Sequence, residues 1–280
     1  MPLDFESFPL RAFRKSRELD WDPLDIDFSR DRDDWAQLTS DEQDMLLRQV
    51  DGFYIGERAV THDLGALQQC LRQQRGRMGE EMYLTAQLYE ESRHIEFFQM
   101  WLDETLPGEF GTDIPFPNML QDGLTLDDLL NTQMTKRFHS LFTDPSPENQ
   151  VRAVVVYHMI VEGVAAEVGY HLFYDMIDSK SVLPALRQGI TLIKRDESRH
   201  VAFGIYLLQR LLAEDPSLIE VFEEEMHLLK PRACQGIDQA FTHRPEPYPF
   251  GLDHRRYLEL VDHYFDARLE AVKRGTLVEI

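Results

Sequence analysis

The sequence predicts an all-α protein in which long helices pack as a bundle. Apolar residues recur with helical spacing through most of the chain. Strand signals are weak, because β-branched runs are short and no Asn-Gly hairpin turn occurs. Of the 280 residues, 43% are apolar and 28% are charged, which is typical of a globular protein. No linker interrupts this pattern, and we therefore expect residues 1–280 to form a single domain.

Caps and helix-breaking residues set the expected boundaries of the elements. Residues 1–38 contain three prolines and an acidic run, and we expect them to be loosely structured. Thr39 and Glu42 form the pattern of a capping box, which predicts a helix from there to about residue 73. We expect further helices at about residues 79–106, 124–143, 146–178, 182–213, 217–242 and 252–273.

Acidic side chains outnumber basic ones by 50 to 29, which gives a net charge of −21. This balance argues against partners that attract basic patches, such as a nucleic-acid backbone or an anionic membrane surface. No apolar run approaches the length of a membrane span, and the N-terminus lacks the apolar core of a signal peptide. Two cysteines cannot form a disulfide framework. We expect a cytoplasmic protein with no integral membrane segment and no nucleic-acid partner.

The sequence contains one short motif twice. The tetrapeptide Glu-Ser-Arg-His occurs at residues 91–94 and again at residues 197–200. A glutamate precedes each copy by a similar distance, because Glu57 lies 34 residues before the first copy and Glu162 lies 35 residues before the second. Residues i and i+3 share one face of a helix, so the glutamate and the histidine of each copy can bind the same ion.

Four helices would thus bring four carboxylates and two imidazoles to one point. Burying these groups without compensation would cost too much free energy, and two divalent cations would compensate them. Carboxylates with one histidine per metal and no sulfur ligand suit iron and manganese. The pattern is that of a ferritin-like four-helix bundle, here with additional flanking helices. The predicted metal ligands are Glu57, Glu91, His94, Glu162, Glu197 and His200.

Two histidines outside this set fit a less specific role. A third Glu-x-x-His pattern at residues 224–227 lies in an acidic run without a matching partner helix, and we interpret it as a solvated helix face. His158 lies four residues before Glu162 but has no counterpart in the other half of the repeat. We expect His158 to be packed in the core or hydrogen-bonded behind the metal ligands.

The pattern resembles the ribonucleotide reductase small-subunit superfamily and, within it, the R2-like ligand-binding oxidases. Val60 follows the first ligand by three residues, and Tyr157 precedes Glu162 by five. The same spacing occurs in those oxidases, where an ether bond joins the valine to the tyrosine. Phe98 stands four residues after His94, where radical-bearing small subunits have a tyrosine.

The resemblance implies a site with one manganese and one iron ion per chain, with two iron ions as the alternative pair. It also implies a long-chain fatty acid bound at the metals, and a homodimer. The reduced metals would activate dioxygen, and the oxidised site would remove hydrogen from Val60 and Tyr157. Asp196 would hydrogen-bond one ligand histidine, His94. The ligand pocket would include Tyr170 and Phe98. The resemblance does not imply a physiological substrate.

Two residues, Tyr157 and Glu167, do not fit the resemblance directly. On an ideal α-helix Tyr157 would lie about 140° from Glu162, so a π-bulge or a long reach of the phenol is required. Glu167 stands where the family has an apolar residue, and we expect either an additional carboxylate near the pocket or a surface residue.

Two other functions remain open at this stage. The first is a radical-generating ribonucleotide reductase small subunit that lacks the radical tyrosine. Such subunits dock their large partner through a C-terminal tail, and we expect this role less because few residues follow the last predicted helix. The second is an iron-storage or ligand-binding ferritin-like bundle without organic turnover.

Overall fold

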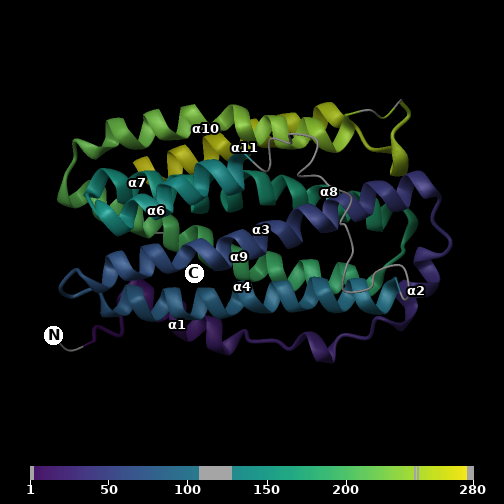
Figure 1. Cartoon of the computed structure of the whole chain (residues 1–280), viewed down its shortest axis with the longest axis horizontal. Coiled ribbons are helices and arrows are strands. Elements are labelled where there is room, and N and C mark those ends of the chain that lie inside the picture. Colours follow the sequence, from purple (N-terminus) through teal and green to yellow (C-terminus); the bar gives the residue numbers. More distant parts are fainter. Residues whose placement is uncertain (1–2, 107–127, 243, 245, 276–280) are drawn as a thin grey trace.

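The computed structural model describes residues 3–106, 128–242, 244 and 246–275, and the regular structure in these ranges is helical. Four long helical segments run along the molecule side by side and form the central bundle (Figure 1). The predicted all-α, ferritin-like class is therefore confirmed. The segments are α3 (Ser40–Arg72), α4 (Met78–Thr105), the continuous run of α7 (Pro147–Val154), the π-helix η3 (Val155–Ala166) and α8 (Glu167–Lys180), and α9 (Pro184–Glu214).

Further helices flank the bundle. Helices α10 (Leu218–Phe241) and α11 (His254–Lys273) lie against η3 (Figure 1). Before α7 come the π-helix η2 (Asp128–Met134) and α6 (Thr135–Thr143), which contact each other and α3. The predicted helix at 124–143 is therefore helical from residue 128, and residues 124–127 lie outside the described part. Helix α10 continues through Pro231.

Local signals explain most helix starts. The capping box at the start of α3 is confirmed, because the amide of Glu42 donates to Thr39 Oγ1 and the amide of Thr39 donates to Glu42 Oε2 at 3.0 Å. Pro147 opens α7 after Ser146, as the break at residues 144–147 predicts, although the Ser146 side chain makes no capping hydrogen bond.

The prediction that residues 1–38 are loosely structured was wrong. They form α1 (Phe8–Glu18), the 3-10 turn η1 (Pro23–Asp25) and α2 (Ser29–Trp35). The acidic run has partners far along the chain. Asp31 accepts the amide hydrogens of Ala185 and Leu186 at 2.9 and 2.8 Å, and Asp34 accepts that of Leu183 at 2.9 Å. Two carboxylates of α2 therefore cap the N-terminus of α9.

The helices of the described part share one hydrophobic core, which extends from α1 to α11. The central bundle contributes its inward faces, and the site described below lies among them. Nowhere in the described ranges is a helix both long and apolar enough to cross a membrane.

Candidate metal centre

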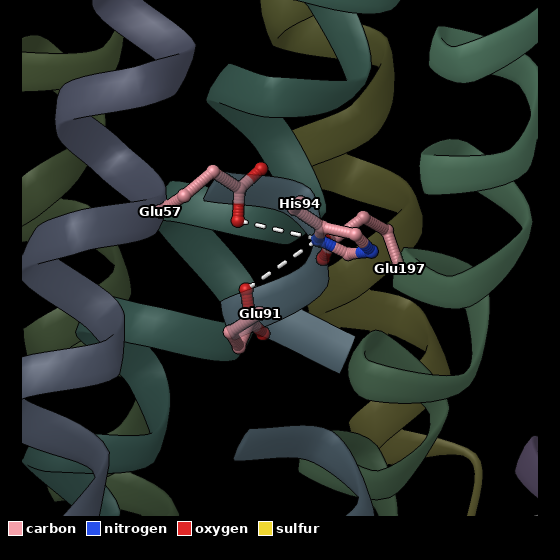
Figure 2. A group of neighbouring side chains, drawn as sticks. All are labelled: Glu57, Glu91, His94 and Glu197. Atoms are coloured by element: carbon pink, nitrogen blue, oxygen red, sulfur yellow. Dashed lines mark hydrogen bonds and ion pairs between the residues drawn. The ribbon is translucent and has the colours of Figure 1, made fainter. Parts of the chain in front are cut away.

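Six predicted side chains converge at the middle of the central bundle. His94 and His200 are fully buried, and the four carboxylates are between 1% and 6% exposed. Figure 2 shows part of this cluster, with Glu57 of α3 facing His94 and Glu91 of α4. Helix α3 contributes one of the six residues, α4 two, η3 one and α9 two. In that order, the six are Glu57, Glu91, His94, Glu162, Glu197 and His200.

The six side chains form two overlapping groups of potential metal ligands. In each group the ligand atoms lie within 4.8 Å of one another. The first group is Glu57, Glu91, His94 and Glu197, and the second is Glu91, Glu162, Glu197 and His200. Glu91 and Glu197 belong to both, so they are placed to bridge two ions.

The two histidines present the same nitrogen to the carboxylates. His94 Nδ1 lies 3.3 Å from Glu57 Oε2 and 3.7 Å from Glu91 Oε2 (Figure 2). It also lies 3.4 Å from Glu197 Oε1. His200 Nδ1 lies 3.0 Å from Glu91 Oε1 and 3.2 Å from Glu197 Oε2. Each imidazole thus directs Nδ1 into the cluster and keeps Nε2 for a second partner.

The electrostatics of the cluster favour the binding of cations. Burial raises the pKa of Glu57 and of Glu162 well above the usual range of a glutamate. Burial acts on Glu91 in the same direction, but His200 and His94 outweigh it and hold the pKa of Glu91 below its usual range. Both carboxylate oxygens of Glu162 are buried without a hydrogen-bond partner. Unpartnered buried carboxylates are rare in proteins, and two divalent cations fit this donor set.

Carboxylates also hold the outward nitrogens of the two histidines. Asp196 Oδ2 lies 3.3 Å from His94 Nε2, the contact that the family resemblance implies, and accepts a hydrogen bond from Trp21 Nε1 at 2.7 Å. Glu90 Oε2 lies 2.9 Å from His200 Nε2. Glu90 was not predicted from the sequence, although an acidic residue precedes both Glu-Ser-Arg-His copies and so extends the repeat to five residues. Such partners orient a metal-binding imidazole.

Arginines of the two repeats cross-link these outer carboxylates. Arg93 Nη2 donates to Asp196 Oδ2 at 2.8 Å. Arg199 Nη2 donates to Asp196 Oδ1 at 2.6 Å and also to Glu90. Burial raises the pKa of Asp196, but the hydrogen bond and charge of His94, the charge of Arg199 and the hydrogen bond of Trp21 outweigh it and hold this pKa below its ordinary value. The acidic residue that precedes each repeat therefore holds the histidine of the other, and the arginines hold these acidic residues.

The π-helix η3 brings Tyr157 to the cluster. In a π-helix the backbone hydrogen bond joins residues i and i+5, so Tyr157 and Glu162 lie on the same face. Tyr157 is 1% exposed, and its hydroxyl donates to Glu91 Oε1 at 2.7 Å. The spacing that an α-helix could not accommodate is therefore explained by the π-helix. Val60, on α3 one turn after Glu57, faces a cavity that reaches the same carboxylates.

This cavity has a volume of about 160 Å³ and lies among α3, η2, η3, α8 and α10. Four site carboxylates and Tyr170 line it. Glycines and alanines on α3, η3 and α10 leave the space open; Gly236 is one position where an added Cβ would meet nothing within 4 Å. Phe98, which was expected in the pocket, is not part of the lining. It is fully buried and packs against Phe53, whose ring does line the cavity.

The remaining predicted positions lie away from the cluster. Glu167 is not part of the cavity lining, because Arg268 Nη2 and Lys194 Nζ hold its carboxylate at 3.2 and 3.1 Å. His158 is packed in the core, with no hydrogen-bond partner on either ring nitrogen, and burial together with the charge of His200 lowers its pKa to about 3. In the third Glu-x-x-His pattern, residues 224 and 227 are exposed, as predicted.

Together the fold and the cluster define a ferritin-like helical bundle with a carboxylate–histidine centre of the di-metal type. Residues 9–273 match the family model of the ribonucleotide reductase small chain. The chain therefore belongs to this family, in its R2-like branch.

Solved structures of R2-like ligand-binding oxidases are similar over nearly the whole chain. One with an aerobically reconstituted Mn/Fe cofactor is 31% identical, with a TM-score of 0.87, and the match covers 96% of this chain and 94% of that one. A point mutant with an anaerobically reconstituted Mn/Fe cofactor is 31% identical, with a TM-score of 0.86 and the same coverage. An aerobically reconstituted point mutant is 30% identical, with a TM-score of 0.88, and the match covers 96% and 95%. The predicted resemblance is thus confirmed.

Proposed function

We propose that this protein is a dioxygen-using oxidase with a dinuclear centre of one manganese and one iron ion. One ion would be held by Glu57, Glu91 and His94, and the other by Glu162, Glu197 and His200, with Glu91 and Glu197 bridging. The observation that carries this proposal is the pair of buried, overlapping ligand groups that share two carboxylates. The Mn/Fe cofactors of the similar oxidases support the choice of metals, and two iron ions are the alternative pair.

The chain itself would orient and insulate this chemistry. When bound in their reduced state, the metals would supply two electrons to dioxygen and activate it. Asp196 and Glu90 hold the two histidines with Nδ1 toward the cluster, so the ligands are oriented before metal binds. The surrounding helices bury every predicted ligand and so exclude bulk water from reactive species.

We further propose that an ether bond forms between the Tyr157 oxygen and the Val60 β-carbon. Formation breaks the phenol O–H bond and the Cβ–H bond, and it releases two protons and two electrons. These electrons and protons would go to dioxygen, which would take two more electrons from the metals and two more protons from solvent and leave as two water molecules. The hydrogen bond from Tyr157 to Glu91 and the position of Val60 on the cavity wall beside Glu57 support this pairing.

The cavity suits an elongated apolar ligand with an acidic head group. Its wall on α3 extends from Met45 to Val60, which is about 22 Å of helix at 1.5 Å per residue. We propose that a long-chain fatty acid occupies it, with the carboxylate at the metals and the chain along the glycines and alanines. Organic extraction of the purified protein followed by mass spectrometry tests this assignment, and Gly236→Leu should lower the recovered ligand.

The central experiment is a loading reaction. Metal-free protein receives manganese and ferrous iron without oxygen, air is admitted, and digested peptides are analysed by mass spectrometry. We expect the peptides that contain Val60 and Tyr157 to become linked with a loss of two hydrogens, only when metals and air are both present. Tyr157→Phe should abolish the link, and Tyr170→Phe, the same change at a buried tyrosine of the cavity wall, should retain it. Two bound metals without any link would contradict the ether proposal.

One observation favours a second candidate, the radical-generating reductase subunit. Trp21 is partly exposed, and its Nε1 donates to Asp196, which contacts His94, so a hydrogen-bonded path leads from near the surface to the cluster. Phe98 occupies the position of the radical tyrosine, so the oxidising equivalent would remain on the metals. Co-purification with a large reductase subunit and restored ribonucleotide reduction would support this function.

Assembly is part of the proposal. We propose a homodimer, as in the related family, and light scattering of the purified protein would measure its mass. A mass of two chains supports the dimer. A cage-sized assembly would instead favour an iron-storage function.

A further inference from the structure

The Tyr157 hydroxyl has two polar neighbours on α4, one helical turn apart. It donates to Glu91 Oε1 at 2.7 Å, and Gln87 Nε2 donates to the phenol oxygen at 2.8 Å. Gln87 is 0% exposed, and Glu91 and Tyr157 are each 1% exposed. The phenol oxygen is therefore held from two sides in a site without access to bulk water.

The direction of these two hydrogen bonds follows from the groups involved. A phenol carries one hydrogen, and an ionised carboxylate only accepts. If the amide oxygen of Gln87 faced the phenol, Tyr157 would stand between two acceptors with a single hydrogen to share. The amide nitrogen must therefore face the phenol, and the phenol hydrogen must point to Glu91. The Gln87 oxygen lies on the other side, buried and without a partner.

The pseudo-symmetry of the chain shows that this glutamine accompanies the tyrosine. With the offset of 105 residues that relates Glu57 to Glu162, Tyr157 corresponds to Gly52. With the offset of 106 that relates the two histidines, Gln87 corresponds to Ile193, which is fully buried. The contact between Tyr157 and Gln87 joins the two halves, and its counterpart, Gly52 with Ile193, has neither a phenol nor an amide. A buried amide with an unpaired oxygen carries a free-energy cost, so the hydrogen bond to Tyr157 accounts for a polar residue at position 87.

We propose that Gln87 is a positioning residue that directs the Tyr157 hydroxyl to Glu91 for the oxidation of this tyrosine. This inference rests on the proposed ether formation. In that reaction the O–H bond of Tyr157 and the Cβ–H bond of Val60 would break, the Glu91 carboxylate would take the phenol proton, and dioxygen would take the two electrons and the second proton. Gln87 holds the oxygen in a single orientation while its bond to the Val60 β-carbon forms.

The test compares Gln87→Met, which keeps the side-chain length but removes the donor, with the wild-type protein. We expect two metals per chain and an unchanged rate of metal oxidation in air, followed by absorbance. The linked fraction of the Val60 and Tyr157 peptides at a fixed early time should fall about fivefold to tenfold, the effect of one buried hydrogen bond. A role of Gln87 in stability alone would instead lower metal occupancy and the oxidation rate together, with no selective loss of the link. An unchanged linked fraction would overturn the inference.

Gln150→Met is the matched control. Gln150 is also buried, donates to Pro145 and accepts from Gln74, but it lies outside the metal cluster and the cavity. We expect this variant to lose stability and to retain the full linked fraction.

A second measurement does not depend on the variant or on the reaction. In metal-free wild-type protein with isotope-labelled tyrosine, the infrared difference against Tyr157→Phe reports the C–O stretch of this one phenol. A phenol that both donates and accepts supports the role of Gln87, and one that only donates overturns it. If the wild type binds metal but forms no link, the ether proposal fails, and this measurement still decides the hydrogen bond.

Discussion

The two helix pairs that build the site carry the same predicted ligands in the same order but differ around them. The first pair is α3 with α4, and the second is η3 with α9. Where the second pair has Tyr157, the first has Gly52, and where the second has Val156, the first has Asp51. Helix α3 is a regular α-helix, whereas the corresponding segment of the second pair is a π-helix.

This difference separates metal binding from reactivity. The repeated residues make a nearly symmetric set of ligands and outer carboxylates. The residues that are not repeated place an oxidisable phenol on one side and open space on the other, because Gly52 lines the cavity. We therefore assign metal binding to the repeated residues, and the proposed ether formation and ligand binding to the residues that are not repeated.

The largest expected effect is on metal content, which should fall further when a ligand that belongs to both groups is removed than when a ligand of one group is removed. Glu91→Ala should remove both metal ions, because Glu91 belongs to both groups, whereas Glu57→Ala should remove only one. Each substitution should lower metal affinity by more than the roughly 10–100-fold that is lost when a carboxylate behind a metal-binding histidine is removed. Elemental analysis after loading and gel filtration measures the metal content. Retention of one ion by Glu91→Ala would contradict the bridging assignment.

The outer carboxylates should show whether the two halves are equivalent. We expect Asp196→Asn to weaken the ion at His94, and Glu90→Gln the ion at His200, each by roughly 10–100-fold. Chelator competition titrations measure both affinities. Asp196 also accepts from Trp21 and two arginines, so its variant should lose more stability than that of Glu90. Wild-type affinity in either variant would show that the contact does not orient its histidine.

Asp51 of α3 should lower the stability of the folded protein at high pH, an effect that its counterpart Val156 cannot have. Burial raises the pKa of Asp51 to about 7, and neither carboxylate oxygen has a hydrogen-bond partner. The folded state therefore holds a proton that the unfolded state releases near pH 4, so this group lowers stability as the pH rises from about 4 to 7. Asp51→Asn should stabilise the protein by about 2 kcal/mol at pH 8, after allowance for solvent screening.

The same variant should have a much smaller effect near pH 4, where the aspartate is protonated in the folded state and about half protonated in the unfolded state. Urea unfolding of metal-free protein at both pH values measures the difference. An equal gain at the two pH values would show that the charge of Asp51 is not its cause.

The smallest expected effect is on the free energy of unfolding and comes from the N-terminal caps of α3 and α7. Thr39→Ala should cost about 1 kcal/mol of unfolding free energy, because it removes the capping box of α3. Ser146→Ala, at the corresponding cap of α7, should cost much less because the Ser146 side chain makes no capping hydrogen bond. Urea unfolding distinguishes the two, and equal losses would contradict this interpretation.

Short-range patterns in the sequence were sufficient for the helical class and for the convergence of six side chains. Capping residues and prolines act on the nearest turn, so the starts of α3 and α7 were predicted within a residue or two. The Glu-x-x-His spacing places two side chains on one helix face whatever surrounds it, and its repetition predicted the meeting of four helices. The extension of the repeat to Glu90 and Asp196 was also readable, although only Asp196 was predicted.

Other features depend on partners far along the chain, and only the tertiary structure decided them. The acidic residues of α2 cap α9 about 150 positions later, which no local pattern indicates. Two contacts with distant residues accommodate the π-helix in the core. Gly204 of α9 has no side chain, which leaves room for His158, and Arg268 of α11 donates to the Gly163 carbonyl at 3.0 Å. The cavity exists because small residues of three separate helices face one another. The sequence by itself thus determined which side chains meet, and the packing of distant helices decided what surrounds them.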